Sequence, residues 1–108
     1  MPPKVKISKE MILDAGFKII REEGYEHFNV RRIAEVLHCS TQPIMYNFKT
    51  VEEIRTAVYK IADDFHTGYI MPDMSEKENP LHKLGMNYIR FGYEEKNLFR
   101  FLDRKSTR

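Results

Sequence analysis

The chain has 108 residues, enough for one domain or for one domain and part of a second. It is 42% hydrophobic and 31% charged, with no apolar run near membrane-spanning length and no amino-terminal signal peptide, so we expect a cytoplasmic protein without a membrane partner. The net charge of +2 is too small to indicate nucleic-acid binding by itself, and the single cysteine excludes an internal disulfide framework.

Basic side chains gather at two places in the amino-terminal half. One group lies in the terminal arm and the other flanks residues 30–48: Lys4, Lys6 and Lys9, then Arg31, Arg32 and Lys49. If both groups lie on one face of the fold, they form a small phosphate-binding footprint. The alternative interpretation is an ordinary solvated charged surface.

The first predicted helix ends near Glu23, with Ser8 as its amino-terminal cap and Gly24 as its stop. We expect it to pack across the two short helices that follow, with Tyr25 and Phe28 filling the junction. Its apolar face consists of Ile12, Leu13, Gly16, Phe17, Ile19 and Ile20.

Residues 29–49, NVRRIAEVLHCSTQPIMYNFK, predict two short helices separated by a tight turn. Asn29 can cap the first helix, Ser40 offers a cap for the second, and Pro43 is tolerated in a first helical turn. His38 interrupts the pattern and tolerates a left-handed backbone better than most residues. This layout is typical of the helix-turn-helix, whose second helix enters the major groove of DNA. The apolar stripe of the first helix is Val30, Ile33, Ala34 and Leu37.

The second short helix carries polar side chains suited to a DNA duplex. Gln42 and Asn47 can make paired hydrogen bonds to an adenine edge. Thr41 and Tyr46 can bond to phosphate or contact a thymine methyl group. A polar helix face that is only solvated is the alternative, but its position on the second helix of this layout favours DNA contact.

Residues 24–54 also carry a series of short motifs. They are Gly24-Tyr25, Asn29-Val30-Arg31-Arg32-Ile33-Ala34, Ser40 with Ile44, Phe48, Lys49 and Thr50. In this order and spacing they closely resemble the amino-terminal domain of tetracycline-repressor-like (TetR) transcription regulators. The chain departs from the family pattern at His38, Pro43, Met45, Asn47 and Val51, where the family commonly has glycine, a small residue, tyrosine, tyrosine and lysine.

The resemblance implies roles for individual positions. Base contacts are implied for Thr41, Gln42, Pro43 and Tyr46, and phosphate contacts for Asn29, Arg31 and Lys49. Ile44 and Phe48 are expected to turn inward and hold the second helix to its scaffold. The resemblance further implies a homodimer on a palindromic DNA operator, released by a small-molecule effector whose identity the sequence does not specify.

The remaining elements are also predicted to be helical, so the expected fold class is all-α. Thr50 and Glu53 form a capping box that opens a linking helix over about residues 50–69, after a DNA-binding domain assigned to residues 1–54. Residues 71–80 are an exposed loop. Helicity resumes at Leu81, breaks at 94–96 and begins again near Leu98.

Residues 70–102 are interpreted as part of an effector-binding and dimerisation domain. Tyr69, Tyr88, Phe91 and Tyr93 could line one wall of a ligand cavity, or they could pack against further helices. Because TetR regulators continue well past this point, we expect a chain truncated after the first part of its ligand domain. Residues 103–108, DRKSTR, do not resemble a helix continuation and are interpreted as a possible non-native tail.

The sequence does not indicate an enzyme. Asp63 and His66 have the spacing of a metal-ligand pair, but two residues are a weak signal, and the chain lacks a phosphate-binding loop and a nucleophile elbow. We therefore predict no catalytic site, no metal and no cofactor. The predicted function is a ligand-responsive DNA-binding transcriptional repressor. The alternative is a protein-interaction module that pairs with a full-length regulator or with another helical partner.

Overall fold

The chain forms helices throughout the part that the computed structural model describes, residues 6–75, 77 and 79–106. No strand occurs in that part, which confirms the all-α fold class. None of its helices is both long enough and apolar enough to cross a membrane. The elements in order are α1 Lys9–Glu23, the short 3₁₀ helix η1 Tyr25–His27, α2 Val30–Leu37, α3 Gln42–Asn47, α4 Val51–Ile70, α5 Pro80–Glu94 and α6 Lys96–Ser106.

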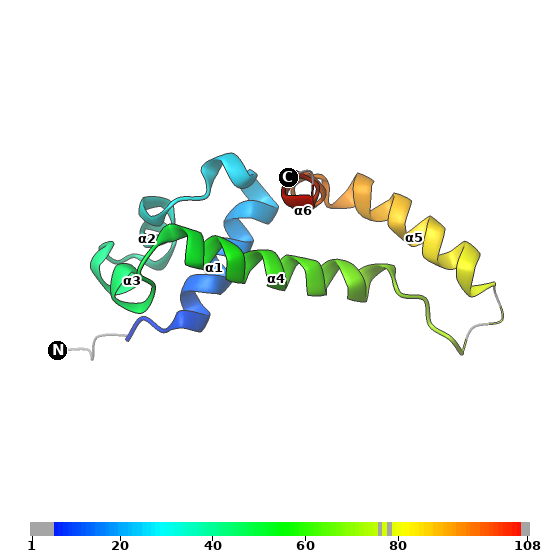
Figure 1. Cartoon of the computed structure of the whole chain (residues 1–108), viewed down its shortest axis with the longest axis horizontal. Helices are drawn as coiled ribbons and strands as arrows, with labels where there is room; N and C mark the ends of the chain where they lie inside the picture. The colour runs from blue at the N-terminus through cyan, green and yellow to red at the C-terminus, as the bar shows by residue number, and fades with distance from the viewer. Residues whose placement is uncertain (1–5, 76, 78, 107–108) are drawn as a thin grey trace.

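The helices form an elongated body with principal extents of 57 × 34 × 20 Å. Helices α1, α2 and α3 gather at one end, and α4 runs away from them for 20 residues (Figure 1). After a loop at the far end, α5 returns beside α4, and α6 closes against α1 and α4 (Figure 1). The first and last helices of the chain are therefore neighbours.

Caps set the ends of the first two helices as the sequence predicts. The Ser8 hydroxyl accepts a hydrogen bond from the Met11 amide at 3.1 Å, and α1 stops at Gly24, whose φ of +100° favours glycine. Asn29 Oδ1 accepts from the Arg32 amide at 2.8 Å. At the end of α2, His38 adopts the expected left-handed backbone, with φ 56° and ψ 46°.

The start of α3 differs from the prediction. Ser40 does not cap it: the helix begins at Gln42, and Thr41 occupies the cap position without a side-chain capping bond. A cap at Ser40 would need an amide donor two or three residues later. Pro43, the third residue after Ser40, has no N–H to donate, which leaves only the Gln42 amide as a donor for such a cap.

The capping box of α4 forms with one change. Thr50 Oγ1 accepts from the Glu53 amide at 3.2 Å, as expected. The Glu53 carboxylate accepts from the Lys49 amide at 2.8 Å instead of from the cap residue itself. The bond therefore ties the exit from α3 to the first turn of α4.

The core lies where α1, α2, α3 and α4 meet, and it continues to α5 and α6 through the buried side chains of Phe91, Leu98 and Phe101. Gly16 of α1 sits at the closest approach: a Cβ there would lie 3.0 Å from Phe28 Cε2 and 3.1 Å from Val58 Cγ2. Only a residue without a side chain lets these three segments pack so tightly. The fully buried aliphatic side chains around it are Ile12, Ile19, Ile20, Ile33, Ile44, Ile54 and Val58.

Helix α5 turns a different face inward from the apolar stripe that its sequence spacing predicts, which runs through Leu81, Leu84, Tyr88 and Ile89. Its buried residues are Asn87 and Phe91, whereas Tyr88, Ile89 and Tyr93 are exposed. Asn87 is buried because its amide donates to the Ile70 carbonyl at 3.1 Å, which satisfies an open carbonyl at the end of α4.

Helix α6 continues further than expected. It extends through Ser106, so the prediction that DRKSTR does not continue a helix is wrong for residues 103–106, while residues 107–108 lie outside the described part. The Arg104 guanidinium lies 4.7 Å from the centre of the Tyr25 ring and donates to its hydroxyl at 3.1 Å. This contact fixes the segment against η1.

Candidate nucleic-acid interface

Helix α3 is held by one side and open on the other. Ile44 is fully buried in the core, as predicted, and Phe48 packs partly buried at the end of the helix. Gln42 is exposed, and Tyr46 is 90% exposed, the largest exposed fraction among the large apolar and aromatic side chains of the described residues. A six-residue helix is too short to persist alone, so its orientation depends on this anchor.

The turn between α2 and α3 fixes the angle at which α3 is presented. Beyond the left-handed His38, the Cys39 amide donates to the Ala34 carbonyl at 3.0 Å. Cys39 itself is partly buried and packs against the core. Backbone bonds of this kind close the end of α2 and direct the chain into α3 without a flexible linker.

The amino-terminal arm lies beside α3. Lys6 and Ile7 share an open surface hollow of about 450 Å³ with Gln42, Pro43, Tyr46 and Asn47. Lys6 is therefore next to the exposed residues of α3, and the Lys9 ammonium group lies 5.6 Å from the centre of the Phe48 ring. That the two basic groups share one face stays a prediction. Lys4 lies outside the described residues.

Asn47 has a different role from the adenine contact expected for it. The side chain is half-buried, and its amide nitrogen donates to the Pro43 carbonyl at 2.7 Å and to the Ile7 carbonyl at 3.3 Å. Paired recognition of adenine needs a donor from the same nitrogen. Asn47 therefore closes the last turn of α3 and ties the arm to it.

The two adjacent arginines of α2 differ in their contacts with the rest of the chain. Arg31 is exposed and has no hydrogen bond or ion pair with any described residue. Arg32 makes a two-point pair with Glu23, at 2.9 and 2.7 Å, and contacts Glu35 at 3.5 Å. These hydrogen bonds raise the pKa of Arg32 and lower the pKa of Glu23. Arg32 therefore joins α2 to α1, whereas Arg31 remains available to a phosphate.

The other two expected phosphate contacts also differ from each other. Lys49 is exposed, and within the described residues only its backbone amide is engaged, by Glu53. Asn29 is exposed too, but its side chain caps α2 and its amide reaches the His27 carbonyl at 3.4 Å. Arg31 and Lys49 thus have exposed side chains without a partner among the described residues, and Lys6 lies beside α3.

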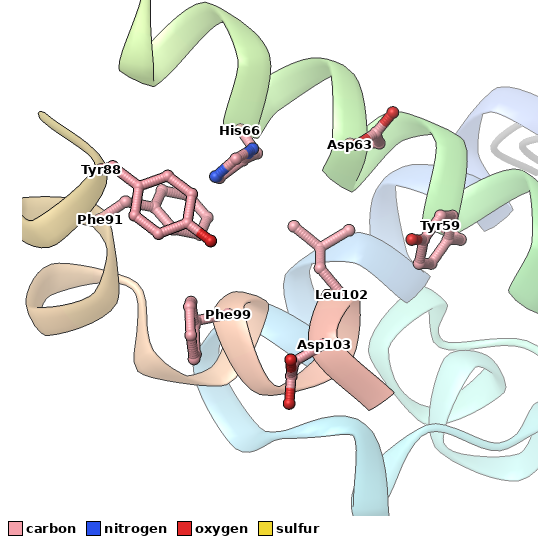
Figure 2. Close-up of a pocket in the computed structure, with 8 residues that line it drawn as sticks. All are labelled: Tyr59, Asp63, His66, Tyr88, Phe91, Phe99, Leu102 and Asp103. Atoms are coloured by element: carbon pink, nitrogen blue, oxygen red, sulfur yellow. The ribbon is translucent and has the colours of Figure 1, made fainter. Parts of the chain in front are cut away.

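Of the four aromatic residues expected at a ligand wall, Tyr69 and Phe91 stand edge-on with ring centres 5.2 Å apart, but only Tyr88 and Phe91 line a cavity. Tyr88 and Phe91 line a cavity of about 180 Å³ between α4, α5 and α6 (Figure 2). The Tyr69 hydroxyl instead donates to Glu94, and Tyr93 is 74% exposed away from the cavity. The pair Asp63 and His66 lies at this cavity, but the described residues contain no group of three potential metal ligands.

The residues of this cavity that sequence reasoning missed come from two helices. They are Tyr59 on α4, and Phe99, Leu102 and Asp103 on α6; Asp63 and His66 on α4 were considered only as a metal-ligand pair. Their spacing was a usable signal, because 59, 63 and 66, and likewise 99, 102 and 103, fall on one face of a helix. What the spacing could not predict is that the two faces oppose each other.

Comparisons with protein-family models, with curated proteins and with solved structures found no match to this chain. The candidate interface therefore depends on the motif pattern of residues 24–54 and on the geometry around α3.

Proposed function

We propose that this chain is a DNA-binding protein that places α3 in the major groove of a duplex. The observation that carries the proposal is the contrast along α3: Ile44 is fully buried, and Tyr46, two residues later, is 90% exposed. A short helix anchored by an apolar residue and presenting Gln42 and Tyr46 outward has the form of a recognition helix. An aromatic ring so exposed contributes nothing to the core, which supports a role in contact with a partner.

Within that class, we propose a TetR-like transcriptional repressor. The resemblance of residues 24–54 to that family supports this choice, as does the long helix α4, which joins the α3 end of the molecule to α5. In this proposal a homodimer occupies a palindromic operator, and a small molecule shifts the spacing of the two α3 helices away from successive major grooves.

The proposed contacts follow from exposure and chemistry. Thr41, Gln42, Pro43 and Tyr46 face the bases, while Arg31 and Lys49 neutralise phosphates. Lys6 is added to the phosphate set because it lies beside α3. Asn29 caps α2, so it supports the helix amino-terminus that faces a phosphate. Asn47 is removed from the base contacts.

The test is DNA binding by the full chain. Duplexes enriched from a random library by the chain itself are used, and affinity is measured by fluorescence anisotropy at several salt concentrations. Gln42→Ala and Tyr46→Ala should each weaken binding by about 1–3 kcal/mol, since each removes a base or phosphate contact. Tyr93→Ala is the matched control, because Tyr93 is similarly exposed but lies on α5.

Helix content of each variant is checked by circular dichroism, so that loss of binding is separated from loss of folding. The proposal fails if the chain enriches no duplex, or if both α3 variants bind as tightly as the unchanged chain. A weak affinity with a steep salt dependence is expected for a single copy, because few phosphates are contacted.

A second candidate function is a protein-interaction module. The observation in its favour is the exposed apolar side of α5, where Leu81 is 75%, Ile89 57% and Tyr88 50% exposed. Such a stripe fits the groove of another helical protein, including a longer regulator of the same kind. Ile89→Glu separates the two: it should abolish partner capture and leave DNA binding by the single chain unchanged.

A further inference from the structure

Met45 is the only purely apolar side chain exposed on α3, all six of whose residues the structure describes. It is 40% exposed, whereas its neighbour Ile44 is fully buried. The other exposed residues of α3 and of its cap position, Thr41, Gln42 and Tyr46, each carry a group that can form hydrogen bonds. Met45 is thus an apolar exception on a surface that otherwise offers hydrogen bonds.

Met45 lies on the face that α3 presents outward. Gln42, Met45 and Tyr46 have the i, i+3, i+4 spacing of residues that share one face of a helix, and all three are exposed. Met45 and Tyr46 lie on either side of Gln42 on this face, and Ile44 holds the opposite side of the helix in the core. A molecule that rests against Gln42 therefore also meets Met45.

The chemistry of the Met45 side chain limits what it can recognise. Its thioether has no hydrogen to donate and accepts only weakly, so it cannot hold a phosphate as Arg31 or Lys49 could. The base edges in the major groove present donors and acceptors, together with one apolar group, the C5 methyl group of thymine. An unbranched, polarisable side chain adapts well to such a small apolar surface.

From its exposure, position and chemistry we propose that Met45 is a specificity-determining residue, which contacts the C5 methyl group of a thymine beside the base pair that Gln42 meets. The preferred duplex then has a thymine at that position, because in unmodified DNA the other three bases lack this methyl group. The inference rests on the proposed function, since it requires α3 to lie in the major groove. It adds a base preference that hydrogen bonding by Gln42 and Tyr46 does not supply.

The test removes the methyl group from the DNA and leaves the rest of the base unchanged. The full chain enriches duplexes from a random library, and each thymine of the preferred duplex is exchanged in turn for deoxyuridine, which keeps every hydrogen-bonding group. Fluorescence anisotropy gives the affinity for each duplex. At least one exchange should weaken binding about three- to fivefold, the effect of about one methyl group returned to water.

Variants of the protein assign that effect to Met45. Met45→Ala should lower the affinity for the thymine duplex by a similar factor and should bind the thymine and uracil duplexes equally. Met45→Leu should keep the preference for thymine, because leucine is apolar and of similar volume. Met86→Ala is the matched control: Met86 is 48% exposed but lies on α5, so this variant should discriminate the two duplexes as the unchanged chain does.

Thr41 is the nearest competitor for the thymine, because it is exposed and carries a methyl group of its own. Thr41→Ser removes only that methyl group. If Thr41→Ser abolishes the discrimination between thymine and uracil while Met45→Ala retains it, the contact belongs to Thr41 and the inference is overturned.

The inference is also overturned if no exchange of thymine for uracil weakens binding to an enriched duplex. That result leaves the proposed function intact, since the chain still selects and binds DNA. Failure of the proposed function has a different form, in which the chain enriches no duplex or in which Gln42→Ala and Tyr46→Ala bind as tightly as the unchanged chain, and the role of Met45 then fails with it.

Discussion

Arg21 of α1 and Glu95, the residue before α6, form a two-point pair, with Nε 2.9 Å from Oε1 and Nη2 2.6 Å from Oε2. They are 74 positions apart in the chain. The hydrogen bonds that Arg21 donates to Glu95, together with the charge of Glu95, raise the pKa of Arg21 above its ordinary value, against an opposing effect of burial. The same turn is fixed a second time, because the Asn97 amide donates to the Arg21 carbonyl at 3.0 Å.

Arg21→Met is expected to lower the free energy of unfolding by up to about 1 kcal/mol, the upper range for a well-aligned exposed pair. Lys18→Met is the control on the same helix. Lys18 reaches Glu22 only at 4.0 Å, and both of those side chains are mostly exposed. Urea unfolding followed by circular dichroism gives both values, and equal effects would mean that the contact with Glu95 adds nothing.

Acid should weaken the junction of α1, η1 and α2. The pKa of Glu23 is lowered by Arg32, and the pKa of Glu26 is lowered by its own backbone and then by Arg100. Since both native values lie below the ordinary 4.5, their stabilisation is complete above that pH and is lost as the pH falls through the native values.

The urea midpoint is therefore expected to drop between about pH 5 and about pH 3. In a chain carrying both Glu23→Gln and Glu26→Gln, the urea midpoint should be lower at neutral pH and should fall less as the pH is lowered. An identical acid-induced fall in this variant would assign the pH dependence to other carboxylates.

Gly16→Ala is expected to destabilise the fold by about 1–3 kcal/mol, because the new methyl group overlaps buried neighbours. The contacts it would make are 3.0 Å to Phe28 and 3.1 Å to Val58. Gly85→Ala on α5 is the matched control, since nothing lies within 4 Å of its added carbon. That change should stabilise by about 0.5–1 kcal/mol through helix propensity, and the two thermal midpoints should move in opposite directions.

Asn47→Ala should act on folding and affinity but not on base preference. It removes two side-chain bonds to backbone carbonyls, worth about 1 kcal/mol together after exchange with water. DNA affinity should fall by a similar factor for all duplexes, since the arm and α3 lose their connection. Gln42→Ala, in contrast, should relax the preference at one base position. Selection profiles of both variants decide between these roles. A loss of adenine preference in Asn47→Ala would mean that Asn47 contacts a base after all.

Arg31→Gln and Arg32→Gln test whether neighbouring arginines have different tasks. Removing Arg31, which is unpaired within the described residues, should reduce the slope of log affinity against log salt by about 1 and leave the thermal midpoint unchanged. Removing Arg32 should lower the thermal midpoint by breaking its pair with Glu23, without changing the slope. If Arg31→Gln instead lowered the thermal midpoint and Arg32→Gln reduced the salt slope, Arg32 would be the phosphate contact and Arg31 the structural residue.

Local signals made most of the helices predictable. Ser8, Asn29 and Thr50 begin helices by accepting hydrogen bonds from amides three residues later, so a short window of sequence contains the whole interaction. Gly24 and His38 stop helices through their own backbone. The buried faces of α1, α2 and α4 follow from apolar spacing for the same reason.

The parts that could not be predicted depend on residues far apart in the chain. Helix α5 turns Asn87 and Phe91 inward because α4 offers the Ile70 carbonyl at that place, which no pattern within α5 indicates. Asn47 is polar and follows Tyr46, and its bonds to the carbonyls of Pro43 and of the distant Ile7 show that it faces the protein. The helical state of residues 103–106 likewise depends on Tyr25, contacted by Arg104 across 79 positions.

That last contact also has a consequence during synthesis. Tyr25 leaves the ribosome well before Arg100 and Arg104, the residues whose guanidinium groups lie 5.2 and 4.7 Å from its ring centre. At translation rates of about 5–20 residues per second, roughly 4–15 s separate the two events. For that interval the nascent chain exposes the surface that α6 later covers, so a chaperone or a neighbouring chain has its best access to this surface before α6 has been synthesised.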